Sequence, residues 1–353
     1  MKLRAPEALE GRPAFEAGLP PFDTEYYPPG PLPAARPPSK MKVLRAISIL
    51  FLASYPPACA AQKAALQDED WSAISIPHDP LKGPPPMVAE RDDYPTFVRE
   101  MIELDWRPAD PIHLFLILPK GQPKPPVILY LYSFPSGTDR FMDDDFCKFL
   151  AQGGFAAAGF VSALTGQRYH NRPMKEWFIS ELQESVGSSV HDVQMILNYL
   201  AGRGDVDTTR AGMFGEGSGA AIAILAAAAD PRIRALDLVD PWGNWPDWLA
   251  KSTLVPDDER ADYLKPEFLK KVAPLDPVVW FDRVKVPVRL QFLSAPLVTP
   301  AAVRKRIAAA APSQAKIISY EDAVAQYKAA KLKFFDWIKD QLRPVAGQDM
   351  SKR

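Results

Sequence analysis

The chain has 353 residues, of which 47% are hydrophobic and 24% charged, so it can bury a large core and belongs with ordinary globular proteins. Its formal net charge is -1 and it has no run of five like charges, which excludes the charged surface expected of a partner of nucleic acid or of an anionic membrane. Of the two cysteines, Cys59 falls in a segment that we expect to be removed. Only Cys147 then remains, and no intrachain disulfide is expected.

Residues 1–40 are rich in proline, often in pairs such as Pro20-Pro21 and Pro37-Pro38, and they have no sustained apolar periodicity. This composition predicts a disordered extension, because paired prolines suit neither a helix nor a central strand. A second possible start follows at Met41, with a short basic stretch after it. We therefore interpret residues 1–40 as lying upstream of the true start.

Residues 41–60 have the three parts of a signal peptide: the basic stretch, the apolar run 46–54, and a small-residue cleavage site at Ala58-Cys59-Ala60. The run is too short to span a bilayer, so we predict export to the periplasm or the outside. Two alternatives are a lipoprotein anchored through Cys59 and a buried helix over the apolar run. The prolines at Pro56-Pro57 disfavour both. Residues 61–94 then form a lead-in to the main domain.

From residue 95 onward, short β-rich runs alternate with longer amphipathic stretches. The first two strands follow each other too closely for an intervening helix and should be antiparallel, whereas the later strands should be parallel. The predicted fold class is α/β: a doubly wound, mostly parallel eight-stranded sheet with helices on both faces, over residues 95–345. Ligands of such sheets bind beyond the carboxyl ends of the strands. The predicted strands are 97–106, 112–118, 127–133, 155–161, 210–214, 235–239, 287–293 and 316–320, and the predicted helices are 141–152, 181–203, 219–229, 262–272, 301–311 and 323–342.

A glycine-rich turn, Gly215-Glu216-Gly217-Ser218-Gly219, joins a predicted strand to a predicted helix. In one interpretation it is the G-x-S-x-G turn that lifts the nucleophile of a hydrolase above its sheet, with Gly217 at the nucleophile position. In another it is a dinucleotide-binding turn ending at Ala220, with Asp237 or Asp240 near the spacing of a ribose-binding acid. That turn normally follows the first strand of its unit, whereas this one comes late in the chain. In a third interpretation, the turn has no functional role and only packs a helix against a strand.

Three segments around this turn resemble the α/β hydrolases, most closely the dienelactone-hydrolase-like and prolyl-oligopeptidase-like members. Residues 127–137 (VILYLYSFPSG) resemble the third-strand segment, with Tyr132-Ser133 where the family's His-Gly precedes the oxyanion loop. Residues 193–212 resemble the helix and strand that lead into the nucleophile turn, and residues 272–288 resemble the approach to the seventh strand. The resemblance runs from about 95 to 342. It implies acyl transfer by Ser, acid and His in that chain order.

Each of those three positions carries a different residue here. Gly217 has no side chain with which to attack, and Ala295 stands where the acid should follow the seventh strand. All four histidines occur at or before His191, so none can follow the eighth strand. The strained turn costs about 1–3 kcal/mol for a residue with a Cβ, whereas glycine adopts positive φ freely. The pattern therefore predicts a retained fold and a lost hydrolase reaction.

An active alternative would use Ser218 as the nucleophile of a displaced turn. This places Glu216 where the turn needs a small residue. His170, in the loop after the fourth strand, is then the candidate base, although such a residue more often serves as a loop hydrogen-bonding group. Asp240 stands where some hydrolases keep an alternative acid, or it caps the turn at Pro241.

The other histidines point to no site. His191 falls within a predicted helix, where a surface or packing role is expected, and His113 falls in an early strand remote from the predicted cleft. No pair of histidines has the close spacing of a zinc motif. We predict neither a metal nor a cofactor.

A cleft retained by such a protein would be aromatic and acidic. Tryptophans after the sixth strand suit a flat or amphipathic ligand, although packing of a cap onto the sheet is the favoured alternative. We predict an exported homologue without hydrolase activity that binds an unknown small molecule or protein in the cleft, and leave an enzymatic role open. The alternatives are an active esterase or peptidase-like hydrolase and a nucleotide-binding oxidoreductase. The candidate ligand-binding residues are Tyr132, Ser133, Tyr169, His170, Glu216, Ser218, Asp240, Trp242 and Trp245.

Overall fold

The computed structural model describes residues 69–76, 84–107, 110–134, 138–164, 178–295, 298–331 and 333–344. The Pro-rich extension (1–40) and the signal peptide (41–60), with the export that it predicts, lie outside the described residues. So do Tyr169 and His170. No helix in the described part of the chain is both long and apolar enough to cross a membrane.

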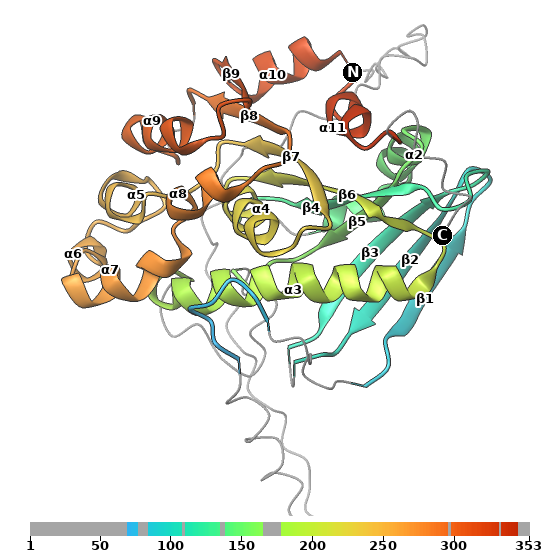
Figure 1. Ribbon diagram of the computed structural model, residues 1–353, viewed down its shortest axis with the longest axis horizontal. Helices are drawn as coiled ribbons and strands as arrows, with labels where there is room; N and C mark the ends of the chain where they lie inside the picture. The colour runs from blue at the N-terminus through green and yellow to red at the C-terminus, as the bar shows by residue number, and fades with distance from the viewer. Residues whose placement is uncertain are drawn as a thin grey trace, which may run out of the picture. The chain divides into compact units, whose positions relative to one another are not determined.

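A nine-stranded sheet in the order β1-β2-β3-β5-β4-β6-β7-β8-β9 forms the centre of the fold (Figure 1). Strand β2 is antiparallel to both β1 and β3, and β3 is antiparallel to β5. From β5 to β9 all neighbours are parallel, which confirms the predicted α/β, mostly parallel sheet. The strands are β1 (Met87–Asp93), β2 (Phe97–Leu104), β3 (Ile112–Pro119), β4 (Pro126–Leu131), β5 (Ala156–Phe160), β6 (Asp207–Glu216), β7 (Ile233–Val239), β8 (Val288–Leu293) and β9 (Lys316–Tyr320).

Strand β1 is a ninth strand that the sequence analysis placed in the lead-in 61–94. Its sequence, MVAERDD, is largely exposed and polar and has no apolar alternation. It pairs with β2 along its length, apart from a register shift between Val88 and Glu90. An edge strand contributes little to the core, so its hydrogen bonds rather than its side chains define it, and a hydrophobic pattern cannot reveal it.

Helices cover both faces of the sheet. Tyr130 of β4 contacts Phe141 and Phe335, which lie beside α2 and α11 respectively, whereas the next residue, Leu131, abuts Gly219 of α4. Because consecutive strand residues point to opposite faces, α4 and the α2–α11 pair cover opposite sides. The helices are α2 (Asp144–Gln152), α3 (Leu182–Arg203), α4 (Ser218–Ala229), α5 (Trp245–Lys251), α6 (Arg260–Tyr263), α7 (Pro266–Val272), α8 (Pro277–Trp280), α9 (Ala301–Ala310), α10 (Ala323–Ala330) and α11 (Asp336–Gln341).

The helix predictions need three corrections. The single helix predicted over 323–342 is wrong, because Lys331 adopts a left-handed conformation (φ +48°) that ends α10 before α11 begins. The helix predicted near 262–272 consists of two short helices, α6 and α7. Helices α5 and α8 were not predicted, because each is too short to show an amphipathic period.

Candidate functional site

The glycine-rich turn lies at the carboxyl end of β6, in the middle of the sheet. Gly217 joins β6 to α4 with φ +53° and ψ −113°, the left-handed conformation expected of a nucleophile turn. A Cβ on Gly215 would lie 2.6 Å from the carbonyl oxygen of Gly219, and one on Gly219 would lie 2.6 Å from the carbonyl carbon of Leu131. The turn therefore needs glycine at both ends, as the G-x-S-x-G pattern implies.

The space into which a nucleophile would project from residue 217 is filled. A Cβ at Gly217 would overlap Oγ of Ser133, lie 2.7 Å from the Cβ of Ser133, and lie 3.0 Å from Nε1 of Trp242. A side chain here would require the loop after β4 to move, because rotating the Ser133 hydroxyl would leave its Cβ in place. The turn thus has the shape of a nucleophile turn, and a side chain at residue 217 would overlap Ser133 as it is now placed.

Ser218, the nucleophile of the active alternative, is the first residue of α4 and is 1% exposed. Its Oγ accepts a hydrogen bond from the backbone N–H of Phe134 at 2.8 Å. The hydroxyl therefore holds the loop after β4 against the start of α4. Neither His113, on β3, nor His191, which bonds to Glu69 and Ala73, serves it as a base.

The loops that would carry the acid and the His lie side by side. After β8, the N–H of Ser294 donates to the carbonyl oxygen of Tyr320 (3.0 Å) and that of Ala295 donates to Glu321 (3.1 Å). Ala295 brings no carboxyl group to this junction. Beyond β9, Asp322 accepts a hydrogen bond from the N–H of Ala325 (2.7 Å) and so caps α10. The positions predicted for the acid and the base are therefore neighbours. Ala295 joins the two loops through its backbone N–H, and Asp322 caps α10.

Asp240 follows β7 and is held in a left-handed backbone conformation, with φ +46°. Its N–H donates to the carbonyl oxygen of Gln291 (2.8 Å), and its carbonyl oxygen accepts from Oγ1 of Thr299 (3.0 Å). Its buried carboxyl has Oδ1 3.8 Å from Nη1 of Arg304. Burial raises the pKa of this carboxyl to about 7, against the opposing effects of Arg304 and Thr299. Asp240 therefore changes charge near neutral pH, as groups at functional sites often do.

Glu216 is a second acidic residue at this edge, at the end of β6. Burial raises the pKa of its carboxyl, and the Arg140 guanidinium opposes that shift. Glu216 also contributes to the raised pKa of Asp240, so the two carboxyl groups repel each other. Two acids with perturbed pKa values, at the carboxyl ends of adjacent parallel strands, are a polar feature that packing alone does not require.

The aromatic candidates are mostly buried. Tyr132 is 9% exposed, its ring centroid lies 6.4 Å from that of Phe214, and Cζ of Arg140 lies 5.6 Å above its ring. Burial also raises the pKa of the Tyr132 hydroxyl. Tyr132 thus packs against the aromatic core, and little of its surface is available to a ligand.

The tryptophans pack in the core, as the structural alternative predicts. Trp242 and Trp245 are both 1% exposed, and their rings lie 4.6 Å and 6.0 Å from that of Trp248. Trp245 also donates from Nε1 to the carbonyl oxygen of Leu275 at 3.1 Å. This arrangement gives Trp245 a packing role. Trp242 packs too, but its Nε1 lies beside the Cβ position of Gly217 and so borders the site.

The dinucleotide interpretation meets two obstacles. The turn follows the sixth strand of the chain, in the middle of the sheet. Asp237, one of the two candidate ribose-binding acids, is fully buried on β7, where its carboxyl accepts hydrogen bonds from Arg289 (2.8 Å) and from Gln291 (2.8 Å). A carboxyl held in this way is not available to a ribose.

Three residues of the site were not predicted: Arg140, Thr299 and Arg304. Each comes from a segment distant in sequence from the glycine-rich turn, and each acts on Glu216 or Asp240. The pattern over 301–311 predicts the amphipathic helix that carries Arg304, but an arginine on such a helix is normally interpreted as part of its solvent face. No local signal could have revealed its approach to Asp240.

No family model matches the sequence, and no curated protein matches it. Solved structures do resemble the fold. An acetyl xylan esterase from Paenibacillus sp. R4 matches with TM-score 0.58 and 16% identity over 79% of this chain and 92% of that one. Acetyl xylan esterase 1 from Thermoanaerobacterium sp. JW/SL YS485 matches with TM-score 0.58 and 17% identity, over 80% and 93%. A 2,6-dihydroxy-pseudo-oxynicotine hydrolase matches with TM-score 0.51 and 16% identity, over 69% and 67%. The chain has the α/β-hydrolase fold.

Proposed function

We propose that this protein is an α/β-hydrolase-fold protein without serine-hydrolase activity, whose former catalytic edge binds a small molecule or a protein partner. The observation that carries the proposal is the crowding at Gly217, where Ser133 and Trp242 occupy the space that a nucleophile would need. A glycine alone could be one substitution away from a serine. The surrounding side chains have instead packed into the space.

The residues at the other two catalytic positions support the same proposal. Ala295 and Glu321 join the loops after β8 and β9 through a backbone hydrogen bond, and no histidine follows His191 in the chain. Acyl transfer by this fold needs an imidazole to remove the proton from the nucleophile and to return it to the leaving group. No imidazole follows β9, so the family's usual proton carrier is missing from its position.

The binding role rests on the polar groups that remain at this edge. Glu216 and Asp240 are acids whose pKa values are raised by burial, and Asp240 also carries a strained backbone. Strained residues and desolvated carboxyls both cost folding free energy, and they are kept most often where a ligand is bound. The proposed ligand therefore brings hydrogen-bond donors or a positive charge to these carboxyl groups.

The test is labelling of the full chain with a fluorophosphonate, followed by intact-mass measurement and peptide mapping. We expect no label on the folded protein. A cooperative unfolding transition in urea shows that the labelled sample is folded. The matched control is Ser218→Ala, and an active serine hydrolase shows that the reagent works. Stoichiometric label on Ser218 that disappears in the variant would contradict the proposal and would establish the active alternative.

A further inference from the structure

The two outermost strands of the sheet, β1 and β9, lie at its opposite ends (Figure 1). Each pairs on one side only, β1 with β2 and β9 with β8. In the part of the chain that the structure describes, no strand pairs with their outer sides. The outer N–H and C=O groups of an edge strand can pair with the backbone of another chain. Both ends of the sheet are therefore open to a partner.

The two ends carry opposite charge. Residues 87–145, which include β1 and β2, hold eleven acidic and six basic side chains, a formal net charge of −5. Residues 301–344, which include α9, β9 and α10, hold four acidic and nine basic side chains, a formal net charge of +5. The net charge of the whole chain, -1, hides this difference. Charge is thus separated across the sheet, from β1 to β9.

The acidic end consists of β1 and residues 142–145, at the start of α2, which hydrogen bonds join. The hydroxyl of Tyr94, just after β1, donates to Oδ1 of Asp144 at 2.7 Å, and Nη1 of Arg99 on β2 donates to the same oxygen at 3.0 Å. These bonds place two acidic segments beside each other. The exposed acidic side chains of this end are Glu90, Asp93, Asp143, Asp144 and Asp145.

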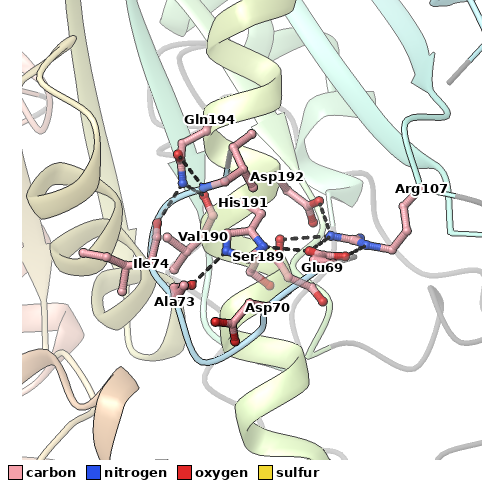
Figure 2. A network of polar contacts seen from close by, with 12 residues as sticks. Glu69, Asp70, Ala73, Ile74, Arg107, Ser189, Val190, His191, Asp192 and Gln194 are labelled. Atoms are coloured by element: carbon pink, nitrogen blue, oxygen red, sulfur yellow. Dashed lines mark hydrogen bonds and ion pairs between the residues drawn. The ribbon is translucent and has the colours of Figure 1, made fainter. Parts of the chain in front are cut away.

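Two of the six basic side chains in residues 87–145 face inward. Arg107 is buried and pairs with Glu69 (2.7 Å) and Asp192 (3.2 Å), as Figure 2 shows. Arg99 is also buried and pairs with Asp92 (2.7 Å). Neither guanidinium reaches the surface, so neither offsets the exposed acids there.

The basic end consists of α9, β9, α10 and the lysines just after α10. Its exposed basic side chains are Lys305, Arg306, Lys316, Lys328, Lys331 and Lys333. Within the described residues, none of these six forms an ion pair. Of the two acidic side chains between 301 and 333, Asp322 accepts from the N–H of Ala325 (2.7 Å), which leaves Glu321. Such a surface attracts an acidic partner and repels a basic one.

Apolar side chains accompany the charges at both ends. Six large hydrophobic side chains of the described residues are exposed. Three of them belong to the acidic end and two to the basic end, and these five are 45% to 53% exposed: Met87, Val88 and Met142, and Ile317 and Val324. A contact between the two ends would therefore bury apolar surface as well as pair charges.

Charge and geometry together select the kind of contact. Two acidic ends, or two basic ends, would place like charges opposite each other, which disfavours a symmetrical pair. Across nine strands about 4.8 Å apart, the acidic and basic ends are on the order of 40 Å from each other. One pair of molecules therefore leaves one end of each kind free. Repetition of such a contact builds a chain of molecules rather than a closed dimer.

We propose that the protein associates head to tail with copies of itself, with the basic end of one molecule docked on the acidic end of the next. The edge strands supply backbone hydrogen bonds, the exposed apolar side chains are buried between them, and the lysines face the carboxylates. Two short strands and their flanks bury little area, so the association is weak and depends on concentration. It does not involve the site at Gly217.

Sedimentation equilibrium of the full chain tests the proposal. Between about 1 μM and about 1 mM protein, we expect the average mass to rise past that of a dimer, because each added molecule presents a new free end. Raising the salt from about 0.01 M to about 0.15 M shortens the Debye length from about 30 Å to about 8 Å and should weaken the association about tenfold. A monomer at every concentration, or association that salt does not weaken, would overturn the proposal.

Two variants each block one end. Ile317→Glu places a negative charge on the basic end, and Val88→Lys places a positive charge on the acidic end. Each variant alone should associate about tenfold more weakly than the wild type, whereas an equal mixture should recover, because it still contains one intact end of each kind. A variant that associates by itself as tightly as the wild type, or a mixture no tighter than its components, would refute head-to-tail docking.

The matched control is Val279→Glu, because Val279 of α8 is 52% exposed and belongs to neither end. It should associate as the wild type does. Urea denaturation of all three variants shows whether they are folded. If Val279→Glu weakened the association as much as the other two substitutions, the contact would not lie at the ends of the sheet and the proposal would fail.

Discussion

Gly217 combines two constraints that usually occur apart. Its φ of +53° favours glycine by itself, and its missing Cβ leaves room that Ser133 and Trp242 occupy. The first constraint belongs to any nucleophile turn and is tolerated in active hydrolases, where the residue at this position is a strained serine. The second belongs to this chain, and it is the one that opposes any side chain at residue 217.

The two constraints can be separated by substitution. Gly217→Ala should cost both the left-handed strain and the overpacking, on the order of 2–4 kcal/mol of unfolding free energy, because the Cβ meets Ser133. The control is Gly121→Ala, at φ +81° with nothing within 4 Å of the added Cβ, which should cost about 1–2 kcal/mol. Urea denaturation measures both. Equal losses at the two positions would show that the site has room for a side chain.

At the scale of elements, Asp276 joins two short helices that the sequence did not predict. Its carboxyl accepts hydrogen bonds from the N–H groups of Asn244 (2.8 Å) and Trp245 (2.9 Å), at the start of α5, and from that of Val278 (3.0 Å) in α8. Neither helix is long enough to be stable by propensity. Their position over the carboxyl edge of the sheet therefore depends on this carboxyl and on the packed tryptophans.

Asp276→Ala should destabilise the fold by about 2–4 kcal/mol, because it leaves three helix-end N–H groups without an acceptor in a buried place. The matched control is Asp322→Ala, which removes a cap bonded to one N–H group, that of Ala325, and should cost about 1 kcal/mol. Chemical denaturation of both variants provides the comparison. A loss at Asp276 no greater than that at Asp322 would mean that packing alone holds α5 and α8.

At the scale of the whole molecule, buried carboxyls couple the folding free energy to pH. The pKa of Asp240 is about 7 in the folded chain, above the value of 3.8 for an ordinary aspartate, so the folded state binds more protons than the unfolded state between these values. Its contribution to stability is therefore greatest at low pH and is lost as pH rises towards 7. Glu69 has the opposite sign: its pKa is lowered to about 2, so its contribution is lost only in strong acid.

Asp240→Asn isolates the first effect. The variant keeps a residue that tolerates the left-handed backbone and removes the titration. Between about pH 4 and about pH 7, the wild type should lose on the order of 3 kcal/mol of unfolding free energy relative to the variant, measured by urea denaturation across that range. Parallel pH profiles for the two proteins would show that the Asp240 carboxyl is ionised throughout. Asp257→Asn, at a side chain that is 98% exposed, is the control.

Much of this molecule was determined by local sequence. The eight predicted strands, their parallel and antiparallel order, and the left-handed glycine turn follow from apolar periodicity and from the glycines at 215, 217 and 219, because buried strands and tight turns restrict residue type wherever they occur. The absence of histidine beyond His191 is likewise a property of the sequence alone.

Tertiary structure decided the rest. The crowding of Gly217 by Ser133 and Trp242, the raised pKa of Asp240, and the three-way contact of His191 with Glu69 and Ala73 each depend on segments far apart in the chain. Sequence analysis expected His191 to be a surface or packing residue, because nothing near it in sequence indicates a buried carboxylate partner. Burial and electrostatics depend on which groups meet in space, and a residue pattern records only which groups follow one another.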